Sequence, residues 1–264
     1  MKELTSFGCG NMAQAIIEGM FKEGASLSFS LYTPSNTRAI ELAAKVSGTH
    51  FSSLQEVPRS DFYMISCKPQ QLDELAFNIK GKLNPDAVII SILAGTTTET
   101  IKSTLGVSKV LRVMPNTPSL VGAGVNAFYF SSEVSVSERS FLTEVFQSFS
   151  KVFTFDEERE IDVITGFSGS GPAYIFEFSR ILIEKMTSMG IDKEIATEMI
   201  KWTFYGSSKL QLESDDSSEE LRNKVTSKKG VTYEALEVFK ESKFEKIVDK
   251  ALDAAYTRSI ELSK

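Results

Sequence analysis

The chain has 264 residues, of which 42% are hydrophobic, and its net charge at pH 7 is −6. This size suits one large domain or two smaller ones with a full core, and an acidic balance without blocks of like charge argues against a nucleic-acid partner. No apolar run reaches membrane-spanning length and no signal-peptide pattern comes first, so we expect a cytoplasmic protein with no membrane contact. Two cysteines and one histidine form no metal motif, so we expect no metal site.

A short apolar strand, residues 4–7, opens the chain and is followed by the pattern Gly-x-Gly-x-x-Ala at residues 8–13. Gly8 and Gly10 would let the backbone turn sharply beside a pyrophosphate, and Ala13 would let the next helix pack close to the strand. The first amides of that helix would then face the phosphates. Small-residue turns also precede ordinary helices, so the pattern indicates a dinucleotide site only together with its context.

Short apolar runs alternate with amphipathic helices as far as about Phe155, which is typical of a parallel sheet with crossover helices. The predicted strands are residues 29–32, 49–52, 62–67, 87–93, 110–114, 125–130 and 152–155. A charged joint follows at residues 157–160, and the pattern beyond it is helical. We therefore predict the α/β class, with an N-terminal Rossmann-type dinucleotide-binding domain over residues 1–158 and an all-α domain over residues 159–264.

The helical half contains a segment that is apolar nearly all round. Pro172 stands where its helix can start and Gly190 where it can stop. About a hundred residues can hardly surround such a helix and also pack on the first domain. We therefore expect self-association, with a second copy of the chain covering this helix. The acidic, serine-rich stretch 213–220 indicates a loop between helices.

The residues after the second predicted strand bear on the choice of cofactor. They include Thr33, Pro34, Ser35 and Arg38, and no carboxylate. A carboxylate there would bind the ribose 2′-hydroxyl and repel a 2′-phosphate, so its absence beside Arg38 favours NADP(H), with NAD(H) possible. The alternative for Ser35 or Asn36 is a plain helix cap.

Further segments end strands at the same edge of the sheet, where loops face the ligand crevice. Lys68, in Cys67-Lys68-Pro69, could contact cofactor or substrate, or could be an ordinary solvated lysine. Asn116, held between two prolines, could place an amide near a nicotinamide ring or belong to a common turn. Cys9 and Cys67 end strands that should be neighbours, so their thiols could form a disulfide or simply be reduced small residues.

The last constellation lies at the start of a predicted helix near residue 230. Ser227 and Thr232 bracket Gly230 there, where free amides favour an anion such as a carboxylate. A Ser/Thr cap is the alternative. The single histidine, His50, falls in the third predicted strand, and we expect it to be structural.

Taken in order, these segments resemble the pyrroline-5-carboxylate reductase family, which makes L-proline. The resemblance runs over nearly the whole chain, through Phe7-Gly8-Cys9-Gly10-Asn11-Met12-Ala13, Cys67-Lys68-Pro69, Ala94-Gly95, Met114-Pro115-Asn116-Thr117-Pro118, the segment 166–174, and Thr226-Ser227 with Gly230 and Thr232. It implies a Rossmann domain followed by a helical dimerisation domain. It also implies dimers that often associate into decamers.

Residue by residue, the resemblance implies a cofactor site and a substrate site. NADPH or NADH would lie on Gly8, Cys9, Gly10, Asn11, Met12, Thr33, Pro34, Ser35, Ser53, Cys67, Lys68, Pro69, Ala94 and Asn116, although many members have asparagine at position 53. The substrate carboxylate would lie at Ser227 and the backbone amides of Gly230, Val231 and Thr232, in a site completed with the partner subunit. Hydride would pass to the carbon of the C=N bond, and we expect the Thr232 hydroxyl to serve the proton on nitrogen.

One departure from the family pattern affects the substrate loop. Lys228 and Lys229 stand where the family usually has Pro-Gly, and Lys224 replaces a common asparagine. Three other functions therefore stay open at this point: a reductase of another cyclic imine, a β-hydroxyacid dehydrogenase-like enzyme, and a non-catalytic NADP(H) sensor. A dehydrogenase of that kind would want a lysine on the interdomain helix, and the segment after Pro172 offers only Lys185.

Overall fold

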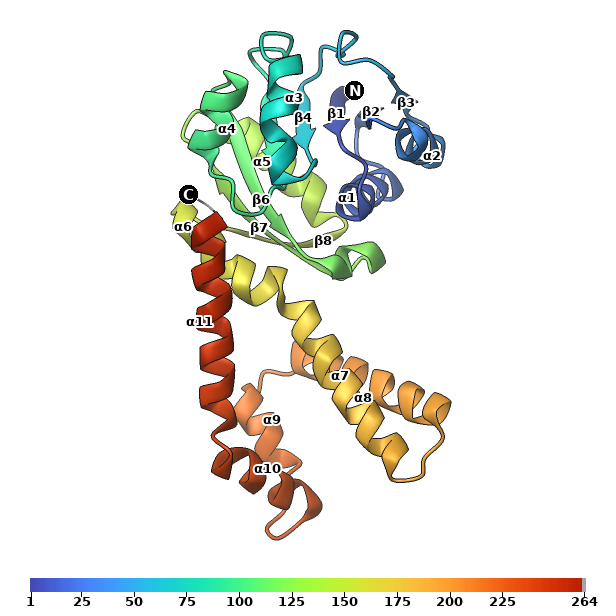
Figure 1. Cartoon of the computed structure of the whole chain (residues 1–264), viewed down its shortest axis with the longest axis vertical. Coiled ribbons are helices and arrows are strands. Elements are labelled where there is room, and N and C mark those ends of the chain that lie inside the picture. The colour runs from blue at the N-terminus through green and yellow to red at the C-terminus, as the bar shows by residue number, and fades with distance from the viewer. Residues whose placement is uncertain (263–264) are drawn as a thin grey trace. The chain divides into compact units, whose positions relative to one another are not determined.

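The structure is a computed structural model that describes residues 1–262. Its residues form two compact units. The first comprises residues 1–170 together with residues 255–262, and the second comprises residues 171–254. The sequence-based division at 158/159 follows the change in secondary structure, whereas the compact units divide at 170/171. The first unit therefore contains chain segments that come before and after the second unit in the sequence (Figure 1).

The first unit is a sheet covered by helices on both faces. The strands are β1 (Lys2–Phe7), β2 (Leu27–Tyr32), β3 (Thr49–His50), β4 (Phe62–Ile65), β5 (Val88–Ser91), β6 (Val110–Pro115), β7 (Gly124–Phe130) and β8 (Ser150–Thr154). The helices are α1 (Asn11–Lys22), α2 (Thr37–Lys45), α3 (Leu72–Ile79), α4 (Thr98–Leu105), α5 (Val136–Gln147) and α6 (Glu158–Ile164), with short helices η1 (Pro69–Gln71), η2 (Thr117–Val121) and η3 (Thr165–Gly169), the last a π-helical turn. The predicted strands and the predicted fold class are thus confirmed.

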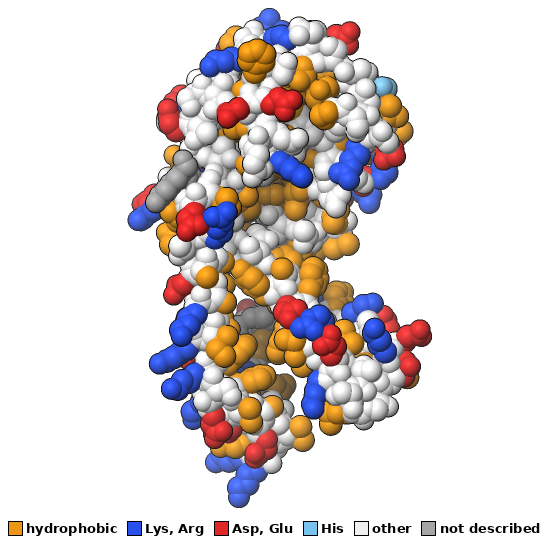
Figure 2. Space-filling model, viewed as in Figure 1, with side chains coloured by type: hydrophobic (Ala, Val, Ile, Leu, Met, Phe, Trp, Pro, Cys, Tyr) orange, Lys and Arg blue, Asp and Glu red, His pale blue; other side chains and the backbone are white. Residues whose placement is uncertain are grey.

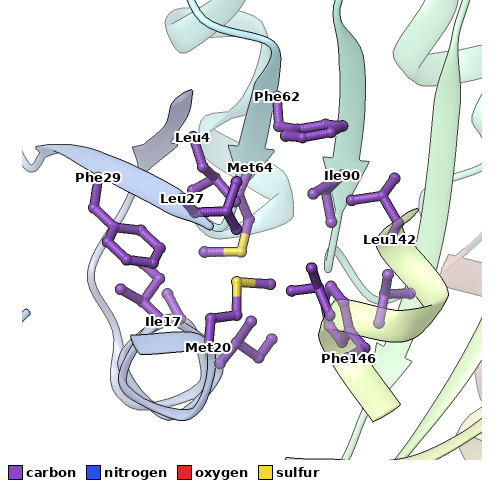
Figure 3. Close-up of a cluster of buried hydrophobic side chains, with 14 of the residues drawn as sticks. Leu4, Ile17, Met20, Leu27, Phe29, Phe62, Met64, Ile90, Leu142 and Phe146 are labelled. Carbon is purple, nitrogen blue, oxygen red and sulfur yellow. The ribbon is translucent and has the colours of Figure 1, made fainter. Parts of the chain in front are cut away.

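The core of this unit lies in two layers, one on each face of the sheet. Residues of α1, α2 and α5 pack on one face, and residues of α3 and α4 pack on the other. In the first layer the side chains of Met20 on α1 and Met64 on β4 point toward one another, between Ile17 and Phe146 (Figure 3). Because buried apolar area is the main favourable contribution to folding, this two-sided core is the main source of stability in the first unit.

The sheet differs from the predicted parallel one at its far edge. Its strand order is β3-β2-β1-β4-β5-β6-β7-β8, and the pairs from β3 to β6 are parallel. β7, however, runs antiparallel to β6, and β8 runs parallel to β7. The reason is the short connection between Pro115 and Gly124, which contains η2 but no crossover helix. A parallel connection needs a dozen or more residues.

The second unit is entirely helical. It contains α7 (Gly171–Ser188), α8 (Lys193–Glu213), α9 (Ser218–Lys224), α10 (Val231–Glu241) and the first part of α11 (Phe244–Leu262). α7 starts and stops as predicted, with Gly190 at φ +95° just beyond its end. The expected loop 213–220 is shorter than predicted. Ser217 caps α9 by accepting from Glu220 N–H while the Glu220 carboxylate accepts from Ser217 N–H, so helix resumes at once.

Apolar side chains of the second unit are mostly exposed. Among residues 171–254, all of them described, Ala196 is the only buried one with an apolar side chain. A stripe on α8 illustrates the pattern, because Ile195, Met199 and Trp202 are each more than half exposed. Figure 2 shows hydrophobic side chains at the surface of these helices. Exposure on this scale marks an interaction surface.

One residue of the predicted charged joint at 157–160, Glu158, belongs to an ionic network around a buried arginine. Glu158 opens α6 and pairs with Arg112 of β6 at 3.2 Å, and Asp162 pairs with the same guanidinium at 2.7 Å. Arg112 is only 1% exposed. Two carboxylates around one buried cation hold α6 firmly on the sheet, because breaking such a pair would leave an uncompensated charge inside the protein.

Candidate functional site

A cleft of about 570 Å³ lies at the carboxyl ends of β1, β2 and β4. We call it the sheet-edge cleft. Nine of the residues expected at the cofactor line it: Gly8, Cys9, Gly10, Thr33, Pro34, Arg38, Ser53, Cys67 and Lys68. Crevices at this edge of a doubly wound sheet are where such folds bind dinucleotides. The local sequence patterns and the tertiary fold therefore agree on one place.

The turn at Gly8 shows why glycine is needed in the floor of the cleft. Its φ is +117°, and a Cβ added there would lie 2.6 Å from the carbonyl oxygen of Ser66. Gly8 N–H donates to Tyr32 O at 2.9 Å, while the Ser66 hydroxyl donates to Gly8 O at 2.8 Å. The turn is thus fixed between β2 and the end of β4. Only a residue without a side chain fits it.

The helix that follows this turn begins beside the cleft. Gly10 is the N-cap of α1 and provides no side-chain hydrogen bond to its first turn. The first intrahelical bond runs from Gln14 N–H to Gly10 O at 2.9 Å, so the amides before Gln14 have no carbonyl of the helix to bind. Uncapped amides with the positive end of the helix dipole make a binding place for a phosphate.

The loop after β2 has the properties expected of a 2′-phosphate site. Thr33 is 7% exposed, and its hydroxyl has no hydrogen-bond partner within the part of the chain that the structure describes. Arg38, in the first turn of α2, lines the same cleft and is exposed. A buried hydroxyl without a partner is costly unless a ligand binds it. Thr33 and Arg38 therefore provide a neutral donor and a cation for an anion.

Lys68 lies at the opposite side of the cleft, just before η1. Its backbone N–H donates to the Gln71 side chain at 3.1 Å, which fixes the turn through Pro69. The Lys68 side chain is exposed beside the cleft. Gln71 and Ser66, which also line the cleft, were missed by the sequence reasoning. Their positions in the sequence, close to Cys67-Lys68-Pro69, could have identified them.

Six expected cofactor residues do not line the sheet-edge cleft: Asn11, Met12, Ser35, Pro69, Ala94 and Asn116. Asn116 has a structural role in this chain. Its side-chain carbonyl accepts from Val125 N–H at 2.8 Å, and its amide group lies 3.4 Å from the carbonyl and the hydroxyl oxygen of Ser168. Asn116 thereby joins the end of β6 to the start of β7 and to η3.

Both thiols of the chain lie at the sheet-edge cleft, and both are free. Burial raises the pKa of Cys9 to about 12, an effect that the nearby Arg38 opposes in part, and it raises the pKa of Cys67 to about 11. Both thiols are therefore protonated at neutral pH. Because the thiolate is the reactive form, they behave as small apolar residues of the cleft wall. His50, in β3, is exposed rather than part of the core.

The predicted substrate loop lies in the second unit, at the start of α10. Gly230 is the N-cap of α10 and offers no side-chain cap, so the amides of Val231 and Thr232 have no helical partner. A Cβ on Gly230 would lie 2.3 Å from the Ser227 hydroxyl oxygen, so that hydroxyl lies directly against the glycine. Ser227, Gly230 and Thr232 are thus brought together around one helix N-terminus.

Lys229 has an unusual backbone conformation in this loop. Its φ is +56°, in the left-handed region that favours glycine. The loop therefore keeps the turn for which the family's glycine is suited, although a lysine stands there. The cost of a left-handed non-glycine residue is about 1–2 kcal/mol.

Two general properties of the described residues complete the picture. Within residues 1–262 no helix is long and apolar enough to cross a membrane. The same residues contain no group of three or more His, Cys, Asp or Glu side chains placed to hold a metal ion.

Comparison with known proteins gives matches along the whole chain. A family model described as pyrroline-5-carboxylate reductase dimerisation matches residues 158–262. Another, described as NADP oxidoreductase, coenzyme F420-dependent, matches residues 4–95. The pyrroline-5-carboxylate reductase of Pseudomonas aeruginosa is 31% identical over 263 residues, which cover 97% of this chain and 95% of that protein. That of Staphylococcus haemolyticus is 32% identical over 267 residues, with 99% and 98% covered.

Solved structures agree with these sequence matches. A pyrroline-5-carboxylate reductase from Coxiella burnetii aligns over 100% of this chain and 99% of its own, with 29% identity and a TM-score of 0.89. The Plasmodium falciparum pyrroline carboxylate reductase with NADP bound aligns over 100% of this chain and 98% of its own, with 26% identity and a TM-score of 0.88. By sequence and by fold over nearly its full length, the chain belongs to the pyrroline-5-carboxylate reductase family.

Proposed function

We propose that this protein reduces 1-pyrroline-5-carboxylate to L-proline with a hydride from NADPH, the last step of proline biosynthesis. The observation that carries the proposal is the sheet-edge cleft, in which nine of the expected cofactor residues meet. The full-length relatives named above are pyrroline-5-carboxylate reductases, which supports the same reaction here.

The residues of the cleft fit a dinucleotide phosphate. The Gly8 turn and the first amides of α1 would hold the pyrophosphate. The buried Thr33 hydroxyl, which has no partner within residues 1–262, and the Arg38 guanidinium would hold the 2′-phosphate. When bound, the reduced nicotinamide supplies the hydride. The cleft residues orient it and exclude water around it.

The start of α10 would hold the substrate. Its uncapped amides favour the carboxylate, the Ser227 hydroxyl lies against Gly230 beside them, and the Thr232 hydroxyl would serve the imine nitrogen. A protonated C=N bond is a strong electrophile. The main task of the protein is therefore to hold ring and imine within reach, which converts an encounter into a nearly unimolecular step.

The test is a turnover assay that follows NADPH absorbance. We expect reduction of 1-pyrroline-5-carboxylate, and little reaction with a six-membered cyclic imine carboxylate or with a β-hydroxyacid and NADP⁺. Faster turnover of the other imine would change the substrate assignment. Binding of NADPH without turnover of any of these compounds would contradict an enzymatic function and favour a non-catalytic NADP(H) sensor. The dehydrogenase alternative has little structural support, because Lys185 lies in the last turn of α7.

Cofactor preference gives a first quantitative prediction. We expect a higher kcat/KM with NADPH than with NADH. Arg38→Met should raise the KM for NADPH by about tenfold to a hundredfold, because a hydrogen bond to a charged group is lost, and should leave the KM for NADH nearly unchanged. Steady-state kinetics with both cofactors measure this. An equal effect on the two cofactors would place Arg38 away from the 2′-phosphate.

Self-association follows from the matched dimerisation region and the exposed apolar face of the second unit. We propose that the assembly unit is a dimer, with the decamers of the family resemblance as further assembly, and that the protein works in the cytoplasm. Light scattering over a range of concentrations would distinguish monomer, dimer and decamer.

A further inference from the structure

The region that matches the dimerisation model returns to the sheet at both of its ends. Its first matched residue, Glu158, and its last, Leu262, contact the segment 94–98, which joins β5 to α4. Both contacts lie within the first unit. The segment is therefore held by residues far from it in the sequence.

Glu158 binds the start of α4 with both carboxylate oxygens. Thr98 N–H donates to Oε1 at 2.7 Å, and the Thr98 hydroxyl donates to Oε2 at 2.8 Å. Arg112, almost fully buried, donates to the same Oε1 at 3.2 Å and fixes the carboxylate from the sheet side. α4 already has its own cap, because the Thr97 side chain accepts from Thr100 N–H. The start of α4 therefore does not need Glu158 as a cap. Its two bonds to Thr98 instead anchor the segment to α6.

The end of α11 forms the second wall of the segment. Gly95 has φ +66°, and a Cβ added to it would lie 2.4 Å from the Leu262 Cβ and 2.7 Å from the Leu262 carbonyl carbon. The last described turn of α11 therefore lies directly on the Gly95 turn. With Glu158 on one end and Leu262 on the other, the segment has little freedom to shift.

The segment follows β5, which is the neighbour of β4 in the sheet. It provides no lining residue of the sheet-edge cleft, which lies at the ends of β1, β2 and β4, so it lies one strand further along the same edge. In a doubly wound sheet the dinucleotide crosses the carboxyl edge, so the loops after the central strands face its nicotinamide half, while its adenine half lies near the loop after β2. We propose that Glu158 is a positioning residue, which holds the segment 94–98 where it bounds the nicotinamide half of the cofactor. The inference rests on the proposed function.

The proposal predicts different effects on the binding of the nicotinamide half and of the adenine half of the cofactor. Glu158→Gln should weaken NADPH binding by about tenfold, because the segment that bounds the nicotinamide loses its anchor. Binding of 2′,5′-ADP, which carries only the adenine half and its 2′-phosphate, should be unchanged. Both affinities are measured by calorimetry, and thermal unfolding is recorded for each variant. Thr98→Val removes one of the two bonds and keeps the Glu158–Arg112 pair, so a smaller loss in the same direction is expected.

Glu138 provides a matched control. Like Glu158 it caps a helix, accepting from the N–H and hydroxyl of Ser135, and it pairs with a cation, Lys109, at 2.8 Å. It belongs to α5 and does not line the sheet-edge cleft. Glu138→Gln should lower the unfolding temperature about as much as Glu158→Gln and leave both affinities unchanged.

The outcomes separate the inference from the proposed function. If the wild type binds neither NADPH nor 2′,5′-ADP, the proposed cofactor site is wrong. If the wild type binds both, but Glu158→Gln and Thr98→Val weaken both ligands equally or neither of them, the positioning role is overturned and the proposed function stands. A loss confined to NADPH, absent in Glu138→Gln, supports the inference.

Discussion

Two arginines show how differently the two units of this protein are built. Arg112 in the first unit and Arg180 in the second each pair with two carboxylates. Arg112 is 1% exposed beneath α6, whereas the Arg180 side chain is 51% exposed on α7. The first unit thus holds a charged cluster in its interior, whereas the second exposes most of its apolar side chains. We therefore expect the stability of the first unit to come from its own core, and that of the second to increase on self-association.

The largest expected effect comes from placing a charge on the exposed apolar face of α8. Trp202→Glu should abolish self-association, because a carboxylate buried in an interface without a partner is strongly unfavourable. Light scattering and the turnover assay measure assembly and activity. The control is Lys201→Glu, which places the same side chain at the adjacent residue. Lys201 is exposed and pairs with Glu198, so this change should leave the assembly intact. Unchanged assembly in Trp202→Glu would show that this face is not the contact surface.

A second prediction compares the two arginines directly. Arg112→Met should destabilise the protein by about 3 kcal/mol, because Glu158 and Asp162 lose a buried partner. Arg180→Met should change the stability little, because exposed ion pairs are screened by solvent and salt. Urea unfolding of the two variants under identical conditions is the measurement. Similar losses for both would mean that Arg112 is not the interior charge that the structure shows.

The third prediction concerns the chemistry assigned to the second unit. Thr232→Ala should lower kcat/KM by tenfold to a hundredfold, the equivalent of about 1.5–3 kcal/mol, because a hydrogen bond to a charged group is lost. The affinity for NADPH should hardly change, since the sheet-edge cleft belongs to the first unit. Steady-state kinetics together with a cofactor titration separate the two quantities. A wild-type kcat/KM would remove Thr232 from the reaction.

The smallest effect is expected at the lysines of the substrate loop. The double variant Lys228→Pro, Lys229→Gly places glycine at the left-handed position and should relieve part of its backbone cost. If the lysines attract the substrate carboxylate, the variant should also raise KM, and the difference from wild type should shrink at high salt. KM measured at low and high ionic strength decides this. An unchanged or lowered KM would show that the lysine charges are incidental.

Local patterns in the sequence predicted most of the first unit. The Gly8 turn, the strands and the amphipathic helices are determined within a few neighbouring residues, which is why Gly8, Thr33, Arg38 and Lys68 could be named from local patterns, while Ser53 came from the family resemblance. The direction of β7 could not be predicted, because an apolar run looks the same in either direction. It depends on the length of the connection after Pro115.

Contacts between residues that are far apart in the chain could not be predicted from the sequence. Glu158 and Arg112 are 46 positions apart, so the ion pair between them could not be predicted from the charged stretch 157–160. Asn116, which is predicted to lie near the nicotinamide, also bonds to β7 and η3, contacts that its position between two prolines did not reveal. The conformation of Lys229 is set by the turn into α10 and runs against its own preference. The first two features depend on tertiary contacts, whereas the third is a local turn that overrides the preference of the residue in it.

The return of α11 to the first unit affects how the protein is made. Residues 255–262 belong to the first unit, and Ala255 and Tyr256 pack against Gly166. During synthesis from the N-terminus, residues 171–254 must therefore leave the ribosome before the first unit can acquire its closing helix. Completion of the first unit therefore requires contacts of long sequence separation, which form slowly. Final consolidation of the first unit thus comes after the helices of the second have been made.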